Sequence, residues 1–170
     1  MNVVLFGFMG VGKTTVGKLL APRLGYRFVD SDSEAEKEAG MRVSEIFTQM
    51  GEPTFRALER GVIRRLSHGD GQVIALGGGA VLDPGNVEEL RAKGRMILLT
   101  ASPEEINIRT RRDSGRPLLA GRDRLTRIRG LLEERRERYL AAADMVVDTN
   151  GVPPIRVAEA ILGRLEAAAS

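Results

Sequence analysis

The chain has 170 residues, of which 42% are hydrophobic and 29% charged, values typical of a single globular domain. It contains no cysteine, which excludes disulfide bonds and thiolate metal sites. No apolar run approaches the roughly 18 residues that a membrane span needs. We expect no signal peptide, because the first strand is predicted to begin at residue 3. Together these features predict a cytoplasmic protein that does not bind membranes.

The formal net charge of +3 raises the question of a nucleic-acid partner. Aromatic residues make up only 4% of the chain, tryptophan is absent, and the arginines are interspersed with carboxylates. Surfaces that bind nucleic acid usually gather their basic and aromatic side chains together. We therefore expect no nucleic-acid partner, and a mildly basic surface also suits a protein that binds anionic small molecules.

The segment at residues 7–14 reads GFMGVGKT and lies between an apolar run, residues 3–6, and a stretch with helical spacing that starts at Thr15. A strand, then G-x-x-x-x-G-K-[ST], then a helix is the context of a phosphate-binding P-loop. Its glycines let backbone N–H groups turn toward phosphate oxygens, and the helix adds its positive end. Lys13 would reach the β- and γ-phosphates and Thr14 would ligate Mg²⁺. A chance Gly-rich turn is the alternative, but the complete motif and its flanks favour a nucleoside triphosphate site.

After this loop, short apolar runs alternate with helical stretches. Further strands are predicted at residues 26–29, 73–76, 96–99 and 145–147. Helices are predicted at residues 33–66 with breaks at Gly40 and at 51–53, at 84–93, from Pro103 with Ser102 as its cap, at 124–142 and at 154–168. Strands that alternate with helices, without a hairpin signal, predict a parallel sheet covered on both faces within one domain, residues 1–170.

Two regions are additions to a simple alternation of strands and helices. They are the helical insertion at residues 33–66 and the segment at residues 113–123, which contains glycine, proline and arginine. Ligands of an open parallel sheet bind at the carboxyl ends of its strands. Both regions enter or leave near that edge, so we expect the insertion to bind an acceptor and residues 113–123 to form a lid.

A P-loop alone does not identify the reaction. GTPases recognise guanine with N-K-x-D after a late strand, and the comparable segment here, residues 149–151, reads TNG. Motor and transport ATPases usually end an apolar strand in a carboxylate that holds Mg²⁺, whereas the run at residues 73–76 is followed by three glycines. The switch and motor classes are therefore disfavoured.

Two polar segments follow predicted strands. Asp30 and Asp32 can divide their tasks between a metal ion and an acceptor hydroxyl, or the first can cap the helix that begins near Ser33. The glycines at residues 77–79 are costly in chain entropy unless their backbone approaches something closely. Their N–H groups would suit an anion such as a carboxylate, whereas a tight turn would need fewer glycines.

Several arginines have both a bland and a functional interpretation. Arg56 and Glu59 lie one helical turn apart, either as a surface ion pair or as a guanidinium aimed at a carboxylate ligand. Arg135 lies in a run of charges, for which a solvated helix face is expected. Arg116, which follows Arg112, would either close on a transferred phosphoryl group or remain an exposed loop residue. The residues by themselves leave these alternatives open.

Taken together, these segments resemble the shikimate kinase family over nearly the whole chain. The similarity rests on GFMGVGKTT at residues 7–15, DSD at 30–32, EIF at 45–47, GEPTFRALE at 51–59, LGGGAV at 76–81, RPLL at 116–119, Arg135 four residues before Tyr139, and VDT at 147–149. Each segment is weak alone, but their common order is specific.

The resemblance implies a three-layer αβα P-loop kinase fold with a five-stranded parallel sheet, a helical substrate-binding insertion and a lid. It implies transfer of the ATP γ-phosphoryl group to the 3-hydroxyl of shikimate, which gives shikimate 3-phosphate and ADP on the pathway to chorismate and the aromatic amino acids. The expected partners are shikimate, ATP and one Mg²⁺ ion, and the expected state is a monomer.

The resemblance also implies roles on the donor side. The residues expected to hold the phosphates of ATP are Gly10, Val11, Gly12, Lys13, Thr14 and Thr15. Thr14 would ligate Mg²⁺ directly and Asp30 through water. Lys13 and Arg116 would act on the transferred group, with Arg116 reaching the phosphates of ATP from the lid. Arg112 would flank the adenine.

On the acceptor side, the resemblance makes Asp32 the candidate base that holds the acceptor hydroxyls. It assigns the clamp on the shikimate carboxylate to Arg56, Arg135 and the backbone of Gly78 and Gly79. Many members of the family place a basic residue against the adenine in the loop after the last strand. This chain has GVPP at residues 151–154, so that contact is lost or replaced by backbone.

Two alternatives to this assignment remain. A gluconate kinase shares the P-loop and the type of fold, but not the combination of D-x-D, F-R-x-x-E and three glycines. An inactive relative would only bind nucleotide in a regulatory role. Against it, the chain retains the residues that the chemistry needs, namely Lys13, Thr14, Asp32 and Arg116.

Overall fold

The computed structural model of the chain describes residues 1–111 and 123–170. Its centre is a five-stranded parallel sheet in the order β2-β3-β1-β4-β5. The strands are β1 (Asn2–Phe6), β2 (Arg27–Asp30), β3 (Gln72–Ala75), β4 (Gly94–Thr100) and β5 (Met145–Asp148). All of the predicted strands are therefore present, and the prediction of a parallel sheet is confirmed.

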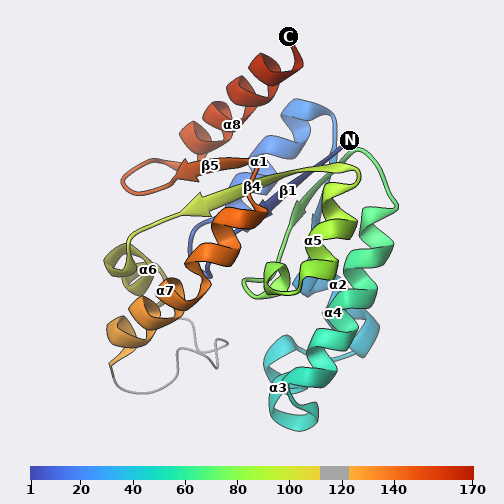
Figure 1. Ribbon diagram of the computed structural model, residues 1–170, viewed down its shortest axis with the longest axis vertical. Coiled ribbons are helices and arrows are strands. Elements are labelled where there is room, and N and C mark those ends of the chain that lie inside the picture. The colour runs from blue at the N-terminus through green and yellow to red at the C-terminus, as the bar shows by residue number, and fades with distance from the viewer. Residues whose placement is uncertain (112–122) are drawn as a thin grey trace.

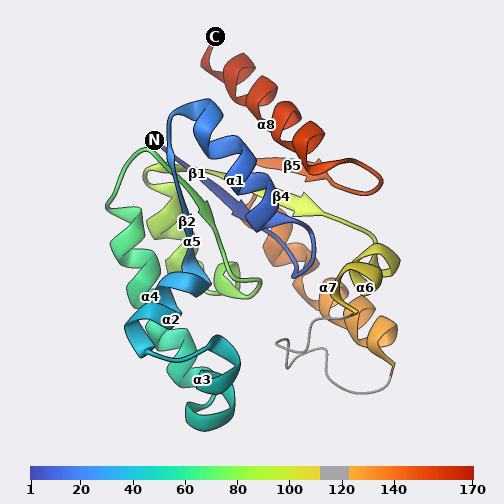
Figure 2. The ribbon, with the colours of Figure 1, turned by 180° about the vertical axis from the view of Figure 1, so that it is seen from behind.

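The sheet is covered on both faces by helices, which completes the three-layer arrangement predicted from the sequence. α1 (Lys13–Leu24) and α8 (Pro154–Ala169) pack against each other on one face, where Figure 2 shows α1 in front of the strands. α5 (Pro84–Arg91) and α7 (Arg124–Ala142) pack against β4 on the other face, in front in Figure 1. α6 (Pro103–Thr110) follows β4 and packs against α7.

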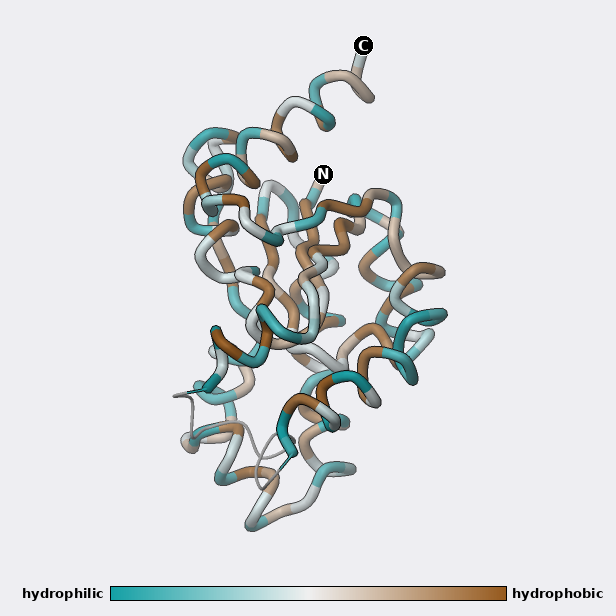
Figure 3. The backbone as a smooth tube through the Cα atoms, turned by 90° about the vertical axis from the view of Figure 1, so that its left-hand side faces the viewer, coloured by the Kyte–Doolittle hydropathy of each residue, from teal (hydrophilic) through white to brown (hydrophobic). Residues whose placement is uncertain are grey.

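The apolar runs of the sequence account for the core. Every residue of β1 and of β3 is buried, as expected for central strands of a sheet that is covered on both sides. Figure 3 shows hydrophobic residues concentrated along the central strands, whereas the helices alternate hydrophobic and hydrophilic positions. Within the described ranges, no helix is long and apolar enough to cross a membrane.

The insertion between β2 and β3 consists of three helices. They are α2 (Ser31–Ala39), α3 (Val43–Met50) and α4 (Glu52–Ser67). The predicted breaks are confirmed at Gly40 and Gly51, which have φ angles of 68° and 88° that favour glycine. The first helix begins at Ser31 rather than Ser33, because the Asp30 side chain accepts a hydrogen bond from the Ser33 N–H and caps the helix.

The P-loop also folds slightly differently from the prediction. α1 begins at Lys13 rather than Thr15, directly after Gly12, whose φ of 98° ends the loop. Because β1, β3 and β2 are consecutive neighbours in the sheet, their carboxyl ends bring three segments together. These segments are the P-loop after β1, residues 30–32 at the end of β2, and the three glycines after β3. A short 3₁₀ helix, η1 (Ala80–Leu82), follows the glycines.

Candidate active site

A cleft with a volume of about 700 Å³ opens at this edge of the sheet. The predicted site residues that line it are Gly10, Gly12, Lys13, Thr14, Thr15, Asp30, Asp32, Arg56, Gly78, Gly79 and Arg135. Val11 does not line the cleft, because its side chain is 1% exposed and belongs to the core. Arg112 and Arg116, and with them residues 112–122 of the predicted lid, lie outside the described residues.

The P-loop end of the cleft carries the charge of Lys13. Its Nζ donates hydrogen bonds to the carbonyl oxygens of Gly7 at 2.6 Å and Phe8 at 3.4 Å. The φ angle of Gly7 is 144°, and a Cβ atom there would lie 2.4 Å from the carbonyl oxygen of Leu99. Glycine is therefore required at this position both by backbone conformation and by the neighbouring strand.

Asp30 connects the P-loop to the helix that carries Asp32. Its Oδ2 accepts a hydrogen bond of 3.1 Å from the Thr14 hydroxyl, while its Oδ1 accepts the capping bond from Ser33 N at 3.1 Å. The interpretation of Asp30 as a helix cap is therefore confirmed, and Asp30 also lines the cleft. The hydroxyl and the carboxylate are oxygen ligands of the kind that Mg²⁺ prefers.

The three glycines after β3 are explained by the side chains that approach them. A Cβ atom at Gly77 would lie 2.6 Å from Oδ1 of Asp32, and one at Gly79 would lie 2.5 Å from Nη2 of Arg56. Real Cβ atoms do not approach other atoms this closely, so larger residues would displace both charged groups. Gly78 lies between them, and Nη1 of Arg135 is 3.6 Å from the position of its Cβ. The turn is thus the point at which one carboxylate and two guanidinium groups meet.

The backbone N–H groups of this turn differ in whether they are already hydrogen-bonded within the protein. Gly77 N–H donates to Oγ of the buried Ser31 at 3.0 Å. Within the described part of the chain, the N–H groups of Gly78 and Gly79 donate to no acceptor. Two neighbouring donors at the edge of the cleft are therefore free to bind an anion.

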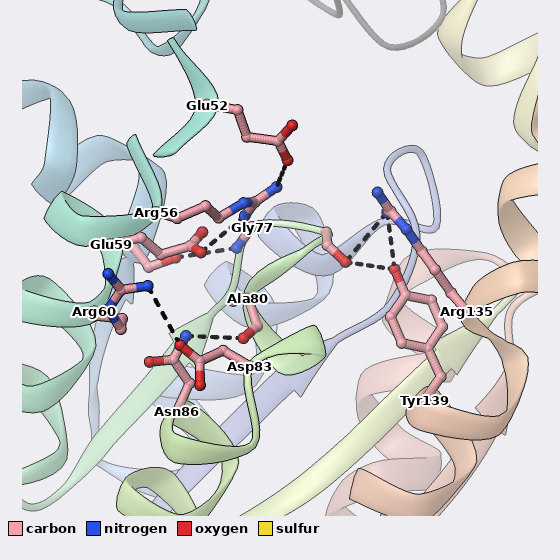
Figure 4. A network of polar contacts seen from close by, with 12 residues as sticks. Glu52, Arg56, Glu59, Arg60, Gly77, Ala80, Asp83, Asn86, Arg135 and Tyr139 are labelled. Atoms are coloured by element: carbon pink, nitrogen blue, oxygen red, sulfur yellow. Dashed lines mark hydrogen bonds and ion pairs between the residues drawn. The ribbon is translucent and has the colours of Figure 1, made fainter. Parts of the chain in front are cut away.

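Arg56 is held by the carboxylates of Glu59 and Glu52, as Figure 4 shows. Its Nη1 donates to Oε1 of Glu59 at 2.8 Å, and its Nη2 lies 3.4 Å from Oε1 of Glu52. The rings of Phe55 and Phe47 lie 5.3 Å and 6.0 Å from the guanidinium carbon. Burial raises the pKa of Glu59, an effect that the positive charge of Arg56 opposes. The ion pair between Arg56 and Glu59 is therefore partly buried and fixes the position of the Arg56 guanidinium, unlike a surface ion pair.

Arg135 corrects an expectation drawn from its surroundings in the sequence. It does not lie on a solvated face, because only 6% of it is exposed. The buried residues of α7 include Ile128, Arg135, Tyr139 and Ala142, whose spacing places them on one side of the helix. The charged residues around Arg135 hid this apolar spacing in the sequence.

The surroundings of Arg135 contain no counter-charge that the structure describes. Its Nη1 donates to the Tyr139 hydroxyl at 3.3 Å and to the carbonyl oxygen of Gly78 at 3.4 Å. The ring of Phe8 lies 5.5 Å from its guanidinium carbon. No carboxylate of residues 1–111 or 123–170 lies within 4.0 Å of it. A buried guanidinium of this kind is a strong candidate for binding an anionic ligand.

Arg109 of α6 was not singled out from the sequence. Its Nη1 donates to the carbonyl oxygen of Gly10 and to Oγ1 of Thr149, each at 3.2 Å, and Nη2 donates to the carbonyl oxygen of Thr149 at 3.2 Å. Glu105 holds its Nε at 3.0 Å. Arg109 therefore joins the P-loop to the loop after β5. That loop reads GVPP at residues 151–154 and has no basic residue there. The only signal in the sequence was the i,i+4 spacing from Glu105.

A cleft that joins a P-loop to carboxylates and arginines on a separate helical insertion defines the class of this protein, an ATP-dependent P-loop kinase. A family model described as shikimate kinase matches residues 9–166. The chain therefore belongs to the shikimate kinase family, as the resemblance indicated.

Individual relatives agree with the family match. The chain is 47% identical over 161 residues to the shikimate kinase of Caldanaerobacter subterraneus subsp. tengcongensis, covering 95% of this chain and 94% of the relative. It is 49% identical over 150 residues to that of Geobacter sulfurreducens, covering 88% and 82%.

Solved structures extend the comparison to three dimensions. A structure of shikimate kinase from Acinetobacter baumannii in complex with shikimate has a TM-score of 0.95 at 37% identity, covering 98% of this chain and 93% of that one. Shikimate kinase from Aquifex aeolicus has a TM-score of 0.87 at 36% identity, covering 99% and 98%. The predicted P-loop kinase fold is confirmed.

Proposed function

We propose that this protein transfers the γ-phosphoryl group of ATP to the 3-hydroxyl of shikimate, giving shikimate 3-phosphate and ADP. The observation that carries the proposal is the convergence of Asp32, Arg56 and Arg135 on the three-glycine turn, which lies beside the P-loop. An acceptor with one carboxylate and several hydroxyls matches a site with two guanidinium groups and one carboxylate. The reaction would serve aromatic amino acid biosynthesis, with the protein acting as a monomer on two small molecules.

On the donor side, the backbone from Gly10 to Thr15 would bind the phosphates, and Lys13 would compensate their negative charge. Mg²⁺ fits the pair formed by the Thr14 hydroxyl and the Asp30 carboxylate, which approach each other to 3.1 Å at the cleft. The described residues hold no cluster of three or more His, Cys, Asp or Glu side chains. Mg²⁺ commonly uses one or two protein ligands and takes the others from phosphates and water, and when bound it would neutralise charge on the transferred group.

On the acceptor side, Asp32 would accept the proton of the attacking hydroxyl and orient it toward the γ-phosphate. Arg56, Arg135 and the N–H groups of Gly78 and Gly79 would bind the carboxylate at the far end of the acceptor. Holding both ends of the substrate would fix the distance between hydroxyl and phosphate. For Arg116, assigned to the transferred group, and Arg112, assigned to the adenine, the proposal rests on the family resemblance alone. Arg109 is a further candidate at the nucleotide end, because it contacts Gly10.

The proposal is tested by measuring ADP release in the presence of Mg²⁺ with shikimate, with gluconate and without an acceptor. We expect ADP release with shikimate only, and its loss in Lys13→Ala. Release with gluconate instead would identify the other kinase specificity. Nucleotide binding without turnover on any acceptor would identify an inactive relative, and binding of ATP measured by calorimetry separates this outcome from a protein that has not folded.

A further inference from the structure

Tyr139 of α7 lies behind the acceptor end of the cleft, where none of the roles above assigns it a function. Only 5% of it is exposed, and its ring meets that of Phe6 in β1 edge to face, with 6.0 Å between the ring centroids. Its hydroxyl is the only polar part of an otherwise apolar contact. Burial raises the pKa of this hydroxyl, so it remains protonated and can donate a hydrogen bond.

The Tyr139 hydroxyl has two partners, and both belong to segments that we propose bind the carboxylate of the acceptor. It donates a hydrogen bond to the carbonyl oxygen of Gly78 and accepts one from Nη1 of Arg135 at 3.3 Å. Figure 4 shows Tyr139 and Arg135 together on one side of the glycine turn, with Arg56 on the other side. One buried hydroxyl therefore bridges a backbone segment and a guanidinium that come from different elements.

The contact with Gly78 determines where the next donor points. The carbonyl of Gly78 and the N–H of Gly79 belong to one planar peptide group and point in opposite directions when the bond is trans. No peptide bond in the described chain is cis. Because Tyr139 holds the carbonyl toward α7, the Gly79 N–H points away from α7, toward the side on which Arg56 lies.

The contact of Tyr139 with Arg135 determines which N–H groups of the guanidinium remain available to a ligand. Nη1 is used by Tyr139 and Gly78, whereas Nε and Nη2 donate to no residue that the structure describes. The ring of Phe8 restricts the same guanidinium from one face. The Arg135 guanidinium is thus held in position while its Nε and Nη2 can still donate to a ligand. Because the side chain is already ordered, binding a ligand costs little side-chain entropy.

We infer that Tyr139 is a positioning residue for the carboxylate of the acceptor, because its hydroxyl orients the Gly78–Gly79 peptide and the Arg135 guanidinium together. The inference rests on the proposed function, which supplies the carboxylate. Tyr139 does not touch the acceptor in this account. It acts through two groups that do.

The test is the steady-state kinetics of Tyr139→Phe, which keeps the ring and its packing on Phe6 and removes only the hydroxyl. We expect the KM for shikimate to rise about tenfold, since a buried hydrogen bond to a partner of a charged group is lost. The KM for ATP should change less than twofold. The matched control is Tyr26→Phe, which makes the same chemical change at the other tyrosine of the chain, outside the cleft lining, and should leave both constants unchanged.

A second acceptor separates positioning from a general loss of structure. In an analogue of shikimate with a hydroxymethyl group in place of the carboxylate, the anion-binding groups have no charge to bind. Tyr139→Phe should then leave kcat/KM within twofold of the unsubstituted protein. An equal loss with both acceptors would overturn the inference, as would unchanged shikimate kinetics in Tyr139→Phe.

The outcomes distinguish the inference from the function on which it rests. If the unsubstituted protein does not phosphorylate shikimate, both the proposed function and the inference fail. If it does, and Tyr139→Phe matches it, only the inference fails. Calorimetric titration with shikimate repeats the comparison without turnover, and a tenfold weaker binding there supports the same conclusion.

Discussion

Oε1 of Glu59 lies 2.8 Å from Nη1 of Arg56, and this carboxylate is 3% exposed while the arginine faces the cleft. The buried carboxylate therefore holds the guanidinium at the wall of the cleft. Glu59 binds one edge of the guanidinium, and the rings of Phe47 and Phe55 lie near the same planar group and restrict its orientation. An arginine fixed in this way binds a carboxylate with less loss of conformational freedom than a mobile one.

Burial of Glu59 leads to a dependence of stability on pH. Its pKa is raised in the folded protein above the usual 4.5, so the folded state binds this proton more tightly than the unfolded state. The stabilising contribution is complete below pH 4.5 and is lost as the pH rises through the raised pKa. We expect the free energy of unfolding of the unsubstituted protein, relative to Glu59→Gln, to fall over that range. Urea unfolding of both proteins at a series of pH values measures this difference in the free energy of unfolding. A difference that stays constant or grows as the pH rises contradicts the prediction.

Arg56→Ala should weaken acceptor binding specifically. The loss of hydrogen bonds to a charged group, about 1.5–3 kcal/mol, corresponds to a rise in the KM for shikimate of roughly ten- to a hundredfold. The KM for ATP should change little, because Arg56 contacts Glu59 and the three-glycine turn and, among the described residues, no residue of the P-loop. Arg60→Ala is the matched control, since Arg60 lies one turn further along α4 and pairs with Asp83, outside the cleft lining (Figure 4). Unchanged shikimate kinetics in Arg56→Ala would remove it from the carboxylate clamp.

The elements of this fold were predictable because their local signals agree. Apolar runs without alternation mark strands buried on both faces, and glycines with positive φ end the P-loop, α2 and α3. The boundaries were less predictable. The cap on α2 is Asp30, so this helix begins at Ser31, directly after β2. No local pattern distinguished a capping carboxylate from a metal-binding one, and the structure shows that Asp30 caps α2 while it also accepts a hydrogen bond from the Thr14 hydroxyl.

The candidate site was predictable only in part, because burial is a property of the tertiary structure. Arg135 lies among charges in the sequence, and its position on the buried stripe of α7 depends on packing against the glycine turn. Arg109 was missed because its partners, Gly10 and Thr149, are distant in the chain. The three glycines, in contrast, were correctly interpreted as a close approach, although the approaching groups are side chains of the protein itself.

Gly79→Ala should damage acceptor binding without unfolding the protein. The added methyl group would lie 2.5 Å from Nη2 of Arg56, so the guanidinium must shift from its position beside the glycine turn. We expect a rise in the KM for shikimate of about tenfold or more. Gly163→Ala is the matched control, because a Cβ atom there meets nothing within 4 Å. It should leave the kinetics unchanged and stabilise α8 by about 0.5–1 kcal/mol, as measured by thermal unfolding.

Asp32→Asn should separate catalysis from donor binding. Asparagine keeps the shape and the hydrogen-bonding oxygen but is a far weaker base, so kcat with shikimate should fall by about 10²–10⁴-fold. The binding of ATP, measured by calorimetry, should change less than threefold. Glu36→Gln offers a control at another acidic position in the cleft lining, where Glu36 accepts a hydrogen bond from the Val43 N–H. A turnover near that of the unsubstituted protein in Asp32→Asn would show that this carboxylate is not needed in the transition state.

The two bonds of Asp30 predict that its charge and its capping role can be separated. Asp30→Asn removes the charge near Thr14 but leaves an oxygen that caps α2 almost as well. We therefore expect half-maximal activity to require a several-fold higher Mg²⁺ concentration, with little change in the temperature of unfolding. Asp30→Ala loses the cap as well, so it should show the same shift in the Mg²⁺ requirement together with a loss of about 1 kcal/mol in the free energy of unfolding. If both variants need the same Mg²⁺ concentration as the unsubstituted protein, then Asp30 acts only as a helix cap and the metal is held without it.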